Sequence, residues 1–371
     1  MLDIEYIRNN PEKIEKGSKN KGISVDIEKL LELDKKYKKA LQDAESLRAQ
    51  RNEITKLLSS DLGVDQREGH LKKAEILKSN LQKAENFMKG AKAELDEILL
   101  SIPNMVFDDV PVGYDESGNV VLRQEGKKTD FKFEPKDYLE LAKEHDLIDI
   151  DRASKISGSR FGYLKNEAVI LELALVRFAM DTLIKEGFSP VVPPVLIRPE
   201  VMDKLGYTAH GADEDIYRLE KDDLYLVGTS EQSIVPYFAD EVLNREELPK
   251  RFAGFSTCFR REAGSYGKDT RGILRVHQFD KVEMVSFTNP EKSREEHEFL
   301  LSLQERLVKA LEVPYQVVRM CTGDIGFPMA EKFDIESWIP SEGKYRETHS
   351  TSNSTDFQAR RLNTRIKTAE G

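Results

Sequence analysis

The sequence predicts an α+β protein, in which an antiparallel sheet flanked by helices follows an N-terminal antiparallel two-helix coiled coil. Three observations support this prediction. A heptad pattern of apolar residues runs from residue 27 to residue 100 with one polar interruption. Beyond Pro103, segments of alternating apolar and polar residues and helical patterns follow one another without regular strand–helix alternation. The chain has 371 residues, 39% of them hydrophobic, enough to bury a sizeable core and form two domains.

The N-terminal helices are predicted from a seam of apolar residues. No Gly or Pro occurs between Ile27 and Ser60, and apolar residues recur at intervals of three and four with one charged interruption, Arg51. The polar stretch 61–69 is the predicted turn between two helices, each roughly 50 Å long. The seam consists of Leu30, Leu33, Tyr37, Ala40, Ala44, Leu47, Ile54 and Leu58, then Ala74, Leu77, Leu81, Ala84, Met88, Ala91, Leu95 and Ile98.

The helical pair ends where Pro103 and Pro111 introduce a linker, so we expect domains at residues 1–102 and 103–371. Residues 27–100 contain 15 Lys and Arg against 14 Asp and Glu, a net charge of +1, although the whole chain carries -10. A near-neutral arm on an acidic protein is compatible with RNA contacts, which are electrostatic. A structural spacer or an oligomerisation coil remains an alternative interpretation.

The second domain is predicted to contain the following elements. Residues 166–187 form an amphipathic helix, and the Pro-rich segment 188–202 is extended but cannot be a central strand throughout. Residues 223–243 form a strand, a turn and a helix that begins near Thr229 to Glu231. Further strands are expected at 252–262, 276–287, 315–326, 332–339 and 348–366, with a helix at 292–312.

Composition and missing motifs exclude several classes of protein. Cys258 and Cys321 are isolated and lack metal-ligand spacing, which argues against disulfides and against zinc. The N-terminus has no signal-peptide pattern, and no apolar stretch is long enough to span a membrane, so we expect a cytoplasmic protein. No dinucleotide-binding, P-loop, zinc-protease or serine-hydrolase motif occurs.

Charged residues concentrate between residues 257 and 284. If strand geometry continues through this stretch, Arg260 and Glu262 share one sheet face, as do Lys281 and Glu283 on the next strand. The intervening loop adds Lys268, Arg271 and Arg275, and several cations together suit a polyphosphate. We therefore expect a nucleotide site, with a solvated cross-strand Arg–Glu pair as the alternative.

These residues also carry a family resemblance. "CFRREAGSYGKDTRGILRVHQFDKVE" resembles the second signature motif of class II aminoacyl-tRNA synthetases, and "EGFSPVVPPVL", with Pro194, resembles the first. "GTSEQ" and "YRETHSTSNSTDFQARR" are similar to seryl-tRNA synthetases of the bacterial type. The predicted helical hairpin resembles the tRNA-binding arm of that family. The resemblance extends over the whole chain, in family order.

The resemblance implies a serine–tRNA ligase. Such an enzyme activates L-serine with ATP to seryl-adenylate and transfers the seryl group to the 3′ end of tRNA(Ser); charging of tRNA(Sec) is left open. The family further implies a cytoplasmic homodimer that uses Mg²⁺ and no zinc.

The resemblance also assigns roles to individual residues. Arg260 and Glu283 are the expected catalytic residues, and Glu347 the expected Mg²⁺ ligand. Thr-Ser-Glu at the start of a helix also suits an ordinary helix cap, and Phe279 also suits an ordinary core position. The expected ATP ligands are Arg260, Arg261, Glu262, Arg275, Val276, Phe279, Glu347, Thr348, His349 and Ser350; the expected serine ligands are Thr229, Ser230, Glu231, Arg260 and Glu283.

One feature departs from the family. Its third motif, a strand and helix with a glycine-flanked arginine, should follow "DFQARRLNTRIKTAEG" and does not occur before Gly371. We expect a C-terminally truncated version of a longer enzyme. The alternatives are a noncatalytic tRNA-binding paralogue on the same scaffold and, less compatible with the helical arm, a different class II ligase.

Overall fold

The computed structural model describes residues 1–59, 63–209, 214–263 and 272–368. It divides the chain into two units. One unit comprises Leu2–Lys19 and Ile23–Pro103, and the other Met1, Asn20–Gly22 and Asn104–Gly371. None of the described helices combines the length and apolarity that crossing a bilayer requires.

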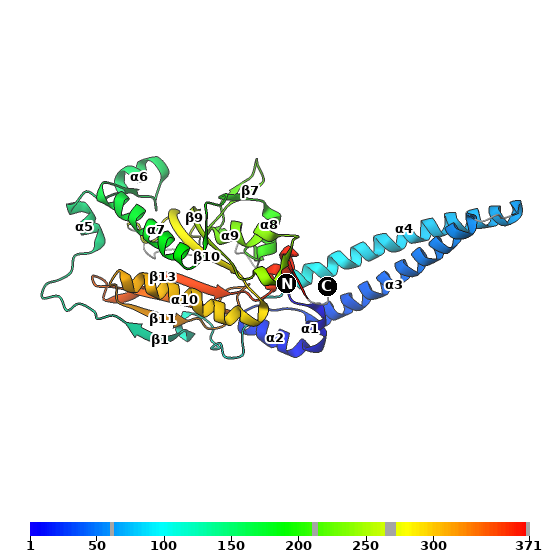
Figure 1. Ribbon diagram of the computed structural model, residues 1–371, viewed down its shortest axis with the longest axis horizontal. Coiled ribbons are helices and arrows are strands. Elements are labelled where there is room, and N and C mark those ends of the chain that lie inside the picture. The colour runs from blue at the N-terminus through cyan, green and yellow to red at the C-terminus, as the bar shows by residue number, and fades with distance from the viewer. Residues whose placement is uncertain (60–62, 210–213, 264–271, 369–371) are drawn as a thin grey trace. The chain divides into compact units, whose positions relative to one another are not determined.

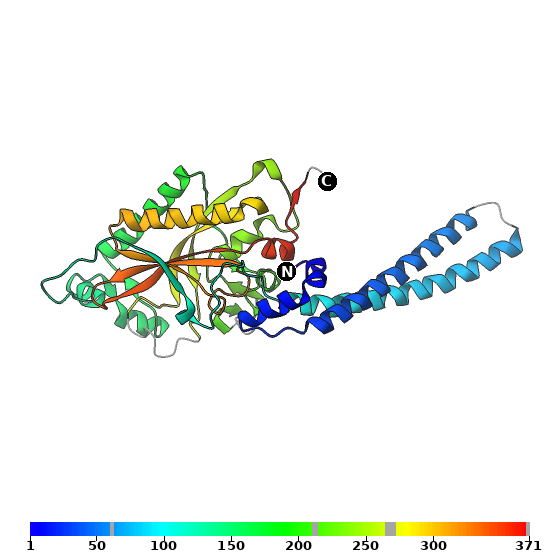
Figure 2. The ribbon, with the colours of Figure 1, turned by 90° about the horizontal axis from the view of Figure 1, so that it is seen from below.

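The first unit is built around a long helical hairpin (Figures 1 and 2). Its helices are α1 (Ile4–Asn9), α2 (Pro11–Asn20), α3 (Ile27–Leu58) and α4 (Val64–Ser101). Every predicted seam residue is buried or half-buried between α3 and α4, while Arg51 is exposed. The seam prediction is therefore confirmed. Ion pairs from Lys36 to Glu94 (3.0 Å) and from Arg48 to Glu85 (2.8 Å) flank it.

The connector of the hairpin is shorter than predicted. The helix α4 already begins at Val64, with Gly63 as its N-cap, so Gly69 lies inside the helix rather than in a turn. The helix has 38 residues and also contains Gly90; each interior glycine costs only about 1 kcal/mol relative to alanine, which the seam contacts of α4 outweigh. Residues 60–62 lie outside the described residues.

Two sheets organise the second unit. An antiparallel four-stranded sheet has the order β1 (Val120–Glu125), β11 (Tyr315–Arg319), β12 (Glu331–Ile339) and β13 (Lys344–Asn353). In a three-stranded sheet, β9 (Lys250–Phe259) pairs antiparallel with β10 (Gln278–Phe287) and parallel with β4 (Ser189–Val191). Within the described residues, β10 and β13 are edge strands.

Smaller elements surround these sheets. The remaining strands form the sets β5–β7–β6, β2–β3 and β8–β14. Their bounds are β2 (Ile148–Asp149), β3 (Tyr163–Leu164), β5 (Leu196–Ile197), β6 (Arg218–Leu219), β7 (Leu224–Leu226), β8 (Val242–Asn244) and β14 (Arg365–Lys367). The helices are α5 (Tyr138–Glu144), α6 (Ile150–Ser157), α7 (Glu167–Lys185), α8 (Pro199–Leu205), α9 (Glu231–Ile234), α10 (Ser293–Ala310) and α11 (Phe357–Leu362).

Helix α10 covers one face of both sheets. Its residues Leu301 and Val308 pack with Val317, Phe333 and Ile335 of the four-stranded sheet. On the other side of the helix, its leucines pack with Ala253 of β9 and with residues around the end of α7; this cluster contains Leu183, Phe188, Leu300 and Leu303. The polar residues Lys281 and Glu283 alternate along β10 with Val282 and Met284, which pack in this cluster, so they point to the opposite face of the strand.

Several predictions about elements are wrong in part. The predicted strand 315–326 ends at Arg319, and helix α8 begins at Pro199, inside the segment 188–202 that was predicted to be extended. Strand β9 ends at Phe259, so Arg260 and Glu262 do not lie on a strand, and Glu262 has φ +55°. Residues 357–362, predicted as strand, form α11. The helix after Thr229 has only four residues, Glu231–Ile234, before it changes to a 3₁₀ turn.

Candidate functional site

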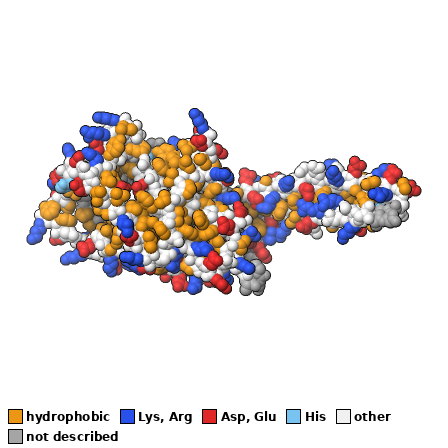
Figure 3. Space-filling model, turned by 45° about the horizontal axis from the view of Figure 1, so that its top comes forward, with side chains coloured by type: hydrophobic (Ala, Val, Ile, Leu, Met, Phe, Trp, Pro, Cys, Tyr) orange, Lys and Arg blue, Asp and Glu red, His pale blue; other side chains and the backbone are white. Residues whose placement is uncertain are grey.

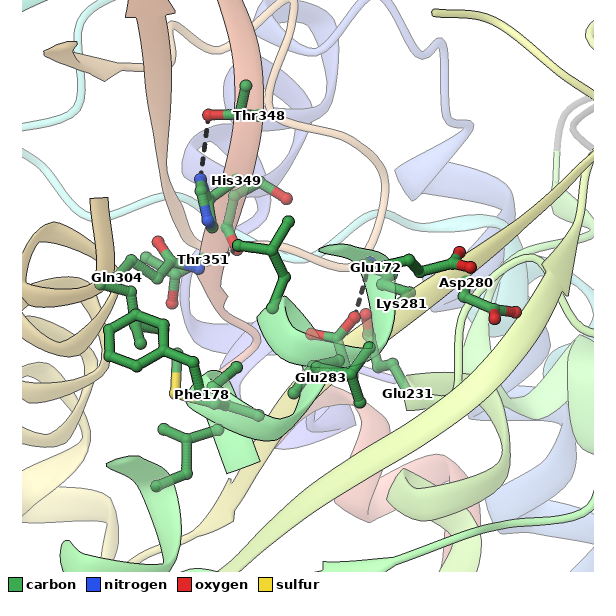
Figure 4. Close-up of a pocket in the computed structure, with 18 of the residues that line it drawn as sticks. Glu172, Phe178, Glu231, Asp280, Lys281, Glu283, Gln304, Thr348, His349 and Thr351 are labelled. Carbon is green, nitrogen blue, oxygen red and sulfur yellow. Dashed lines mark hydrogen bonds and ion pairs between the residues drawn. The ribbon is translucent and has the colours of Figure 1, made fainter. Parts of the chain in front are cut away.

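A cavity of about 850 Å³ lies between β10 and β13. Consecutive residues of both edge strands line it, together with residues of α7 and α10 (Figure 4). Because consecutive strand residues point to opposite faces, the cavity borders both the apolar face against α10 and the polar face. Its polar lining includes Glu231, Lys281, Glu283, His349 and Ser350.

A network of buried polar groups forms the floor on the β10 side. The Thr229 hydroxyl donates to Oε2 of Glu283 (2.7 Å), and the Lys281 ammonium contacts the same carboxylate oxygen (2.6 Å). Lys281 also donates to Oγ1 of Thr229 (3.2 Å). Burial opposes the charge on Lys281, but the ion pair with Glu283 outweighs this and leaves the lysine pKa raised. As predicted, Lys281 and Glu283 share one face of β10.

A second carboxylate, Glu231, lies beside this network. Burial raises its pKa, and the negative charge of Glu283 adds to the rise. The Tyr207 hydroxyl donates to Oε1 of Glu231 at 2.5 Å. Two carboxylates near a single cavity form a site for a small ammonium group, because a cation between them relieves their mutual repulsion.

Ser230, between Thr229 and Glu231, takes no part in this hydrogen-bond network. Ser230 is fully buried, and its hydroxyl has no hydrogen-bond partner among the described residues. Its side chain makes no capping hydrogen bond to α9. The bond that Thr229 accepts from the Glu231 amide is long (3.4 Å), and the Thr229 hydroxyl donates its proton to Glu283. These contacts disfavour the interpretation of Thr-Ser-Glu as an ordinary helix cap.

Arg260 extends beyond the end of β9. Its Nε donates to the carbonyl of Gly228 (3.2 Å), and its guanidinium lies 5.2 Å from the ring centroid of Phe279. Its backbone pairs with His277: the Arg260 amide donates to the His277 carbonyl (3.0 Å). The arginine side chain is thus held by the Gly228 carbonyl, and its backbone is held by His277, just before the start of β10.

The rest of the motif is reorganised relative to the prediction. Glu262 lies after the strand, and its carboxylate accepts from Arg275 (2.7 Å) rather than sharing a sheet face with Arg260. Val276 is half-buried between Arg275 and His277. The exposed Arg261 stacks on Tyr217, with 5.8 Å from guanidinium to ring centroid. Lys268 and Arg271 lie outside the described residues.

Strand β13 carries the second group of predicted ATP ligands. Glu347 and Thr348 are exposed, and the irregularity in pairing between Ile335 and Glu336 brings Glu347 opposite Glu336. Ser350 pairs with Asp334. His349 bonds to the hydroxyl of Thr348 (2.9 Å), and burial, with the charge of Lys281, lowers its pKa to about 4.

The structure brings part of the predicted site together at the cavity. Glu231, Glu283, Thr348, His349 and Ser350 line it, and Thr229 contacts Glu283. The other predicted residues are outside the lining: Ser230, Arg260, Arg261, Glu262, Arg275, Val276, Phe279 and Glu347. Sequence reasoning missed two residues. Tyr207 contacts Glu231 across 24 positions, without a sequence signal. The second is Asp334, which lies opposite Ser350 in the register of β12 and β13. Burial raises the pKa of Asp334 to about 7, and the charge of Glu347 adds to the rise.

Gly254 of β9 lacks a side chain and so leaves space for Ser230 and Ile234, which pack against it. A Cβ at this position would lie 2.4 Å from the terminal carbon of Ile234 and 2.8 Å from the Ser230 hydroxyl. We expect Gly254→Ala to destabilise the chain by about 2 kcal/mol in urea unfolding, because overpacking shifts the loop. Gly90→Ala in α4 is the control: no atom lies within 4 Å of its Cβ, and about 1 kcal/mol of stabilisation is expected. Equal stability of Gly254→Ala and the native chain would contradict this packing argument.

Comparison with known proteins assigns the fold and the site to a class. Residues 215–371 match the family model of the "tRNA synthetase class II core domain (G, H, P, S and T)", and residues 1–106 match that of the "Seryl-tRNA synthetase N-terminal domain". The antiparallel sheets with their flanking helices and polar cavity are thus a class II aminoacyl-tRNA synthetase core.

Full-length relatives narrow the assignment. The chain is 42% identical to a serine–tRNA ligase of Rubrobacter xylanophilus, with 100% of this chain and 88% of the relative covered, and 43% identical to one of Thermobifida fusca, with 100% and 87% covered. The crystal structure of seryl-tRNA synthetase from Pyrococcus horikoshii complexed with ATP superposes with a TM-score of 0.90 at 39% identity, over 100% of this chain and 88% of that one. The chain belongs to the seryl-tRNA synthetase family of ligases.

Proposed function

We propose that this protein activates L-serine with ATP and transfers the seryl group to tRNA(Ser). The observation that supports it most is the pair of carboxylates, Glu231 and Glu283, beside a guanidinium held at Gly228. An α-amino acid carries an ammonium and a carboxylate on the same carbon atom, and the carboxylate pair and the guanidinium offer a partner to each. Thr229 orients Glu283 for the ammonium, while Arg260 receives the carboxylate.

Arg260 also acts on the nucleotide. The serine carboxylate attacks the α-phosphorus of ATP in line, the bond to the bridging oxygen breaks, and pyrophosphate leaves with its electron pair. Arg260 neutralises the charge that develops on the α-phosphoryl oxygens, and its fork of donors orients both reactants. No proton acceptor is needed, because the nucleophile is already ionised. The ribose hydroxyl at the 3′ end of tRNA then attacks the seryl carbonyl and releases AMP.

Selection of serine depends on buried polar groups. In this proposal, Glu283 and the Thr229 loop satisfy the ammonium and hydroxyl of serine. Ser230, with a buried hydroxyl that makes no hydrogen bond among the described residues, lies beside them and belongs to the same loop. Alanine cannot complete these hydrogen bonds, so it is rejected by the cost of leaving them unpaired.

We assign the adenosine and phosphate contacts as follows. Glu262 accepts from the adenine amino group, Phe279 stacks on the base, and Val276 offers its backbone; Arg275, paired with Glu262, and Arg261 face the phosphates. Glu347 with Thr348, His349 and Ser350 borders the triphosphate. Glu347 and Ser350 are hard oxygen donors, and exposure leaves Glu347 accessible, so this pair fits Mg²⁺ shared with substrate phosphates. The ion would supply charge neutralisation when bound.

The N-terminal domain, residues 1–102, is the proposed tRNA-binding arm, and residues 103–371 are the proposed catalytic domain. Lys and Arg side chains are interspersed with Asp and Glu along α3 and α4 (Figure 3). An arm of this kind suits recognition of RNA shape and backbone. Exposed apolar residues on α7, among them Ile170 (66%) and Leu173 (57%), support a homodimer. We place the protein in the cytoplasm.

A change at the tip of the arm is expected to affect tRNA charging but not serine activation. Replacing residues 61–69 with a short linker is expected to reduce charging of tRNA at least tenfold, because backbone contacts are lost, and to leave serine activation unchanged. Aminoacylation and ATP–pyrophosphate exchange are compared on the same preparation. Equal loss in both assays would mean that the arm is structural.

Aminoacylation of tRNA(Ser) with labelled serine tests the proposed function. It is measured on the 371-residue chain and on the chain extended with a family motif 3 segment. Acid-precipitable seryl-tRNA in either form supports the proposal. The second candidate is a noncatalytic tRNA-binding paralogue on the same scaffold. It takes over if tRNA binds and neither form charges it.

A further inference from the structure

Tyr207 lies beside the candidate serine site, and its direction is fixed by a helix end. It follows Gly206, the left-handed C-cap of α8, with φ +89°. The amides of Gly206 and Tyr207 both donate to the carbonyl of Met202, at 3.2 and 3.3 Å. This C-terminal capping pattern needs a residue that tolerates positive φ. A Cβ on Gly206 would also come within 3.1 Å of the Phe327 ring.

Apolar packing holds the ring of Tyr207 while its hydroxyl reaches a charged group. The ring packs against a cluster formed by Ile197, Met202 and Val227. At its tip, the hydroxyl donates to Oε1 of Glu231 at 2.5 Å. A tyrosine is suited to this task because its body is apolar and its hydroxyl is a directed donor.

Four groups act on the Glu231 carboxylate. Glu283 repels it, whereas Lys281, Arg260 and the Tyr207 hydroxyl favour its ionised form. Burial, followed by the charge of Glu231, raises the pKa of Tyr207 well above its usual value, so its hydroxyl keeps its proton and donates. Without Tyr207, the carboxylate would keep the repulsion of Glu283 and lose its neutral donor.

We propose that Tyr207 is a positioning residue for serine binding, whose hydroxyl holds Glu231 so that the second carboxylate oxygen is directed to the substrate ammonium. This inference rests on the proposed function, because it concerns the same amino acid site. Tyr207 touches neither the serine nor the ATP in this account. It acts through the orientation and ionisation of Glu231, as Thr229 and Lys281 act on Glu283.

The test is Tyr207→Phe, which keeps the ring and removes the donor. We expect the KM for serine to rise about tenfold, the effect of one lost hydrogen bond to a charged group, with kcat and the KM for ATP nearly unchanged. Serine affinity should fall as pH drops through the pKa of Glu231, because the protonated carboxyl no longer attracts an ammonium. In Tyr207→Phe this fall should occur at higher pH, since the donor that favours ionisation is gone.

Tyr225→Phe is the matched control. Tyr225 packs against the same apolar cluster from β7, so its variant tests the loss of a hydroxyl in that cluster without touching Glu231. It should leave the KM for serine and the pH profile as in the native chain. The proposal is overturned if Tyr207→Phe matches the native chain in both readouts, or if both variants change equally. Absence of serine-dependent activity in both the 371-residue chain and its motif 3 extension would instead overturn the proposed function.

Discussion

Arg260→Ala is expected to reduce serine-dependent ATP–pyrophosphate exchange by roughly a thousandfold or more. Removing one preorganised donor from a developing oxyanion commonly costs a factor of 10² to 10³. Here the same guanidinium also orients the serine carboxylate, so two contacts are lost. The guanidinium is held by the Gly228 carbonyl and lies against Phe279.

Arg260→Lys tests whether a positive charge alone can replace the guanidinium of Arg260. A lysine keeps the positive charge but cannot form the bidentate contacts of a guanidinium, so we expect intermediate activity. Binding of tRNA, measured by filter retention, should be largely intact in both variants and reports on folding. Unchanged exchange in Arg260→Ala would remove Arg260 from the proposed mechanism.

Glu283→Gln is expected to raise the KM for serine at least a hundredfold. The glutamine keeps the size of the side chain but removes the charge that partners Lys281 and the substrate ammonium. Lys281 and Glu283 are half-buried, and removing one charge of such a pair leaves the other without its partner. The KM for ATP should change much less, because Glu283 faces the amino acid.

The control for Glu283→Gln is Glu295→Gln, an exposed residue of α10. It removes the same charge from the chain without altering the network of Thr229 and Lys281, and its KM for serine should equal that of the native chain. Isothermal titration with serine in the absence of ATP gives a second readout. Native serine affinity in Glu283→Gln would exclude the carboxylate from the serine site.

Periodicity predicted the arm well because its signal is local. The heptad seam depends only on intervals of three and four along one helix, and every apolar seam position is buried or half-buried in α3 and α4. The shared face of Lys281 and Glu283 followed from strand alternation in the same way. These two predictions needed no knowledge of tertiary contacts.

The same reasoning failed where the backbone leaves regular geometry. Alternation placed Arg260 and Glu262 on one strand face, but β9 ends at Phe259 and Glu262 adopts positive φ, so its carboxylate turns to Arg275. The segment 357–362 was predicted as strand, yet it forms α11, and its buried residues Phe357, Gln358, Arg361 and Leu362 recur at helical spacing. Tyr207 and Asp334 could not be predicted at all, since their roles depend on contacts between distant segments.

Serine-dependent ATP–pyrophosphate exchange tests the central claim most directly, because it requires the amino acid site and the nucleotide site together but no tRNA. It is measured with serine, alanine and threonine, on the 371-residue chain and on its motif 3 extension. The account predicts exchange with serine in the extended form, far above that with alanine, and loss of this exchange in Arg260→Ala. Absence of serine-dependent exchange in both forms, or equal exchange with alanine, would contradict it.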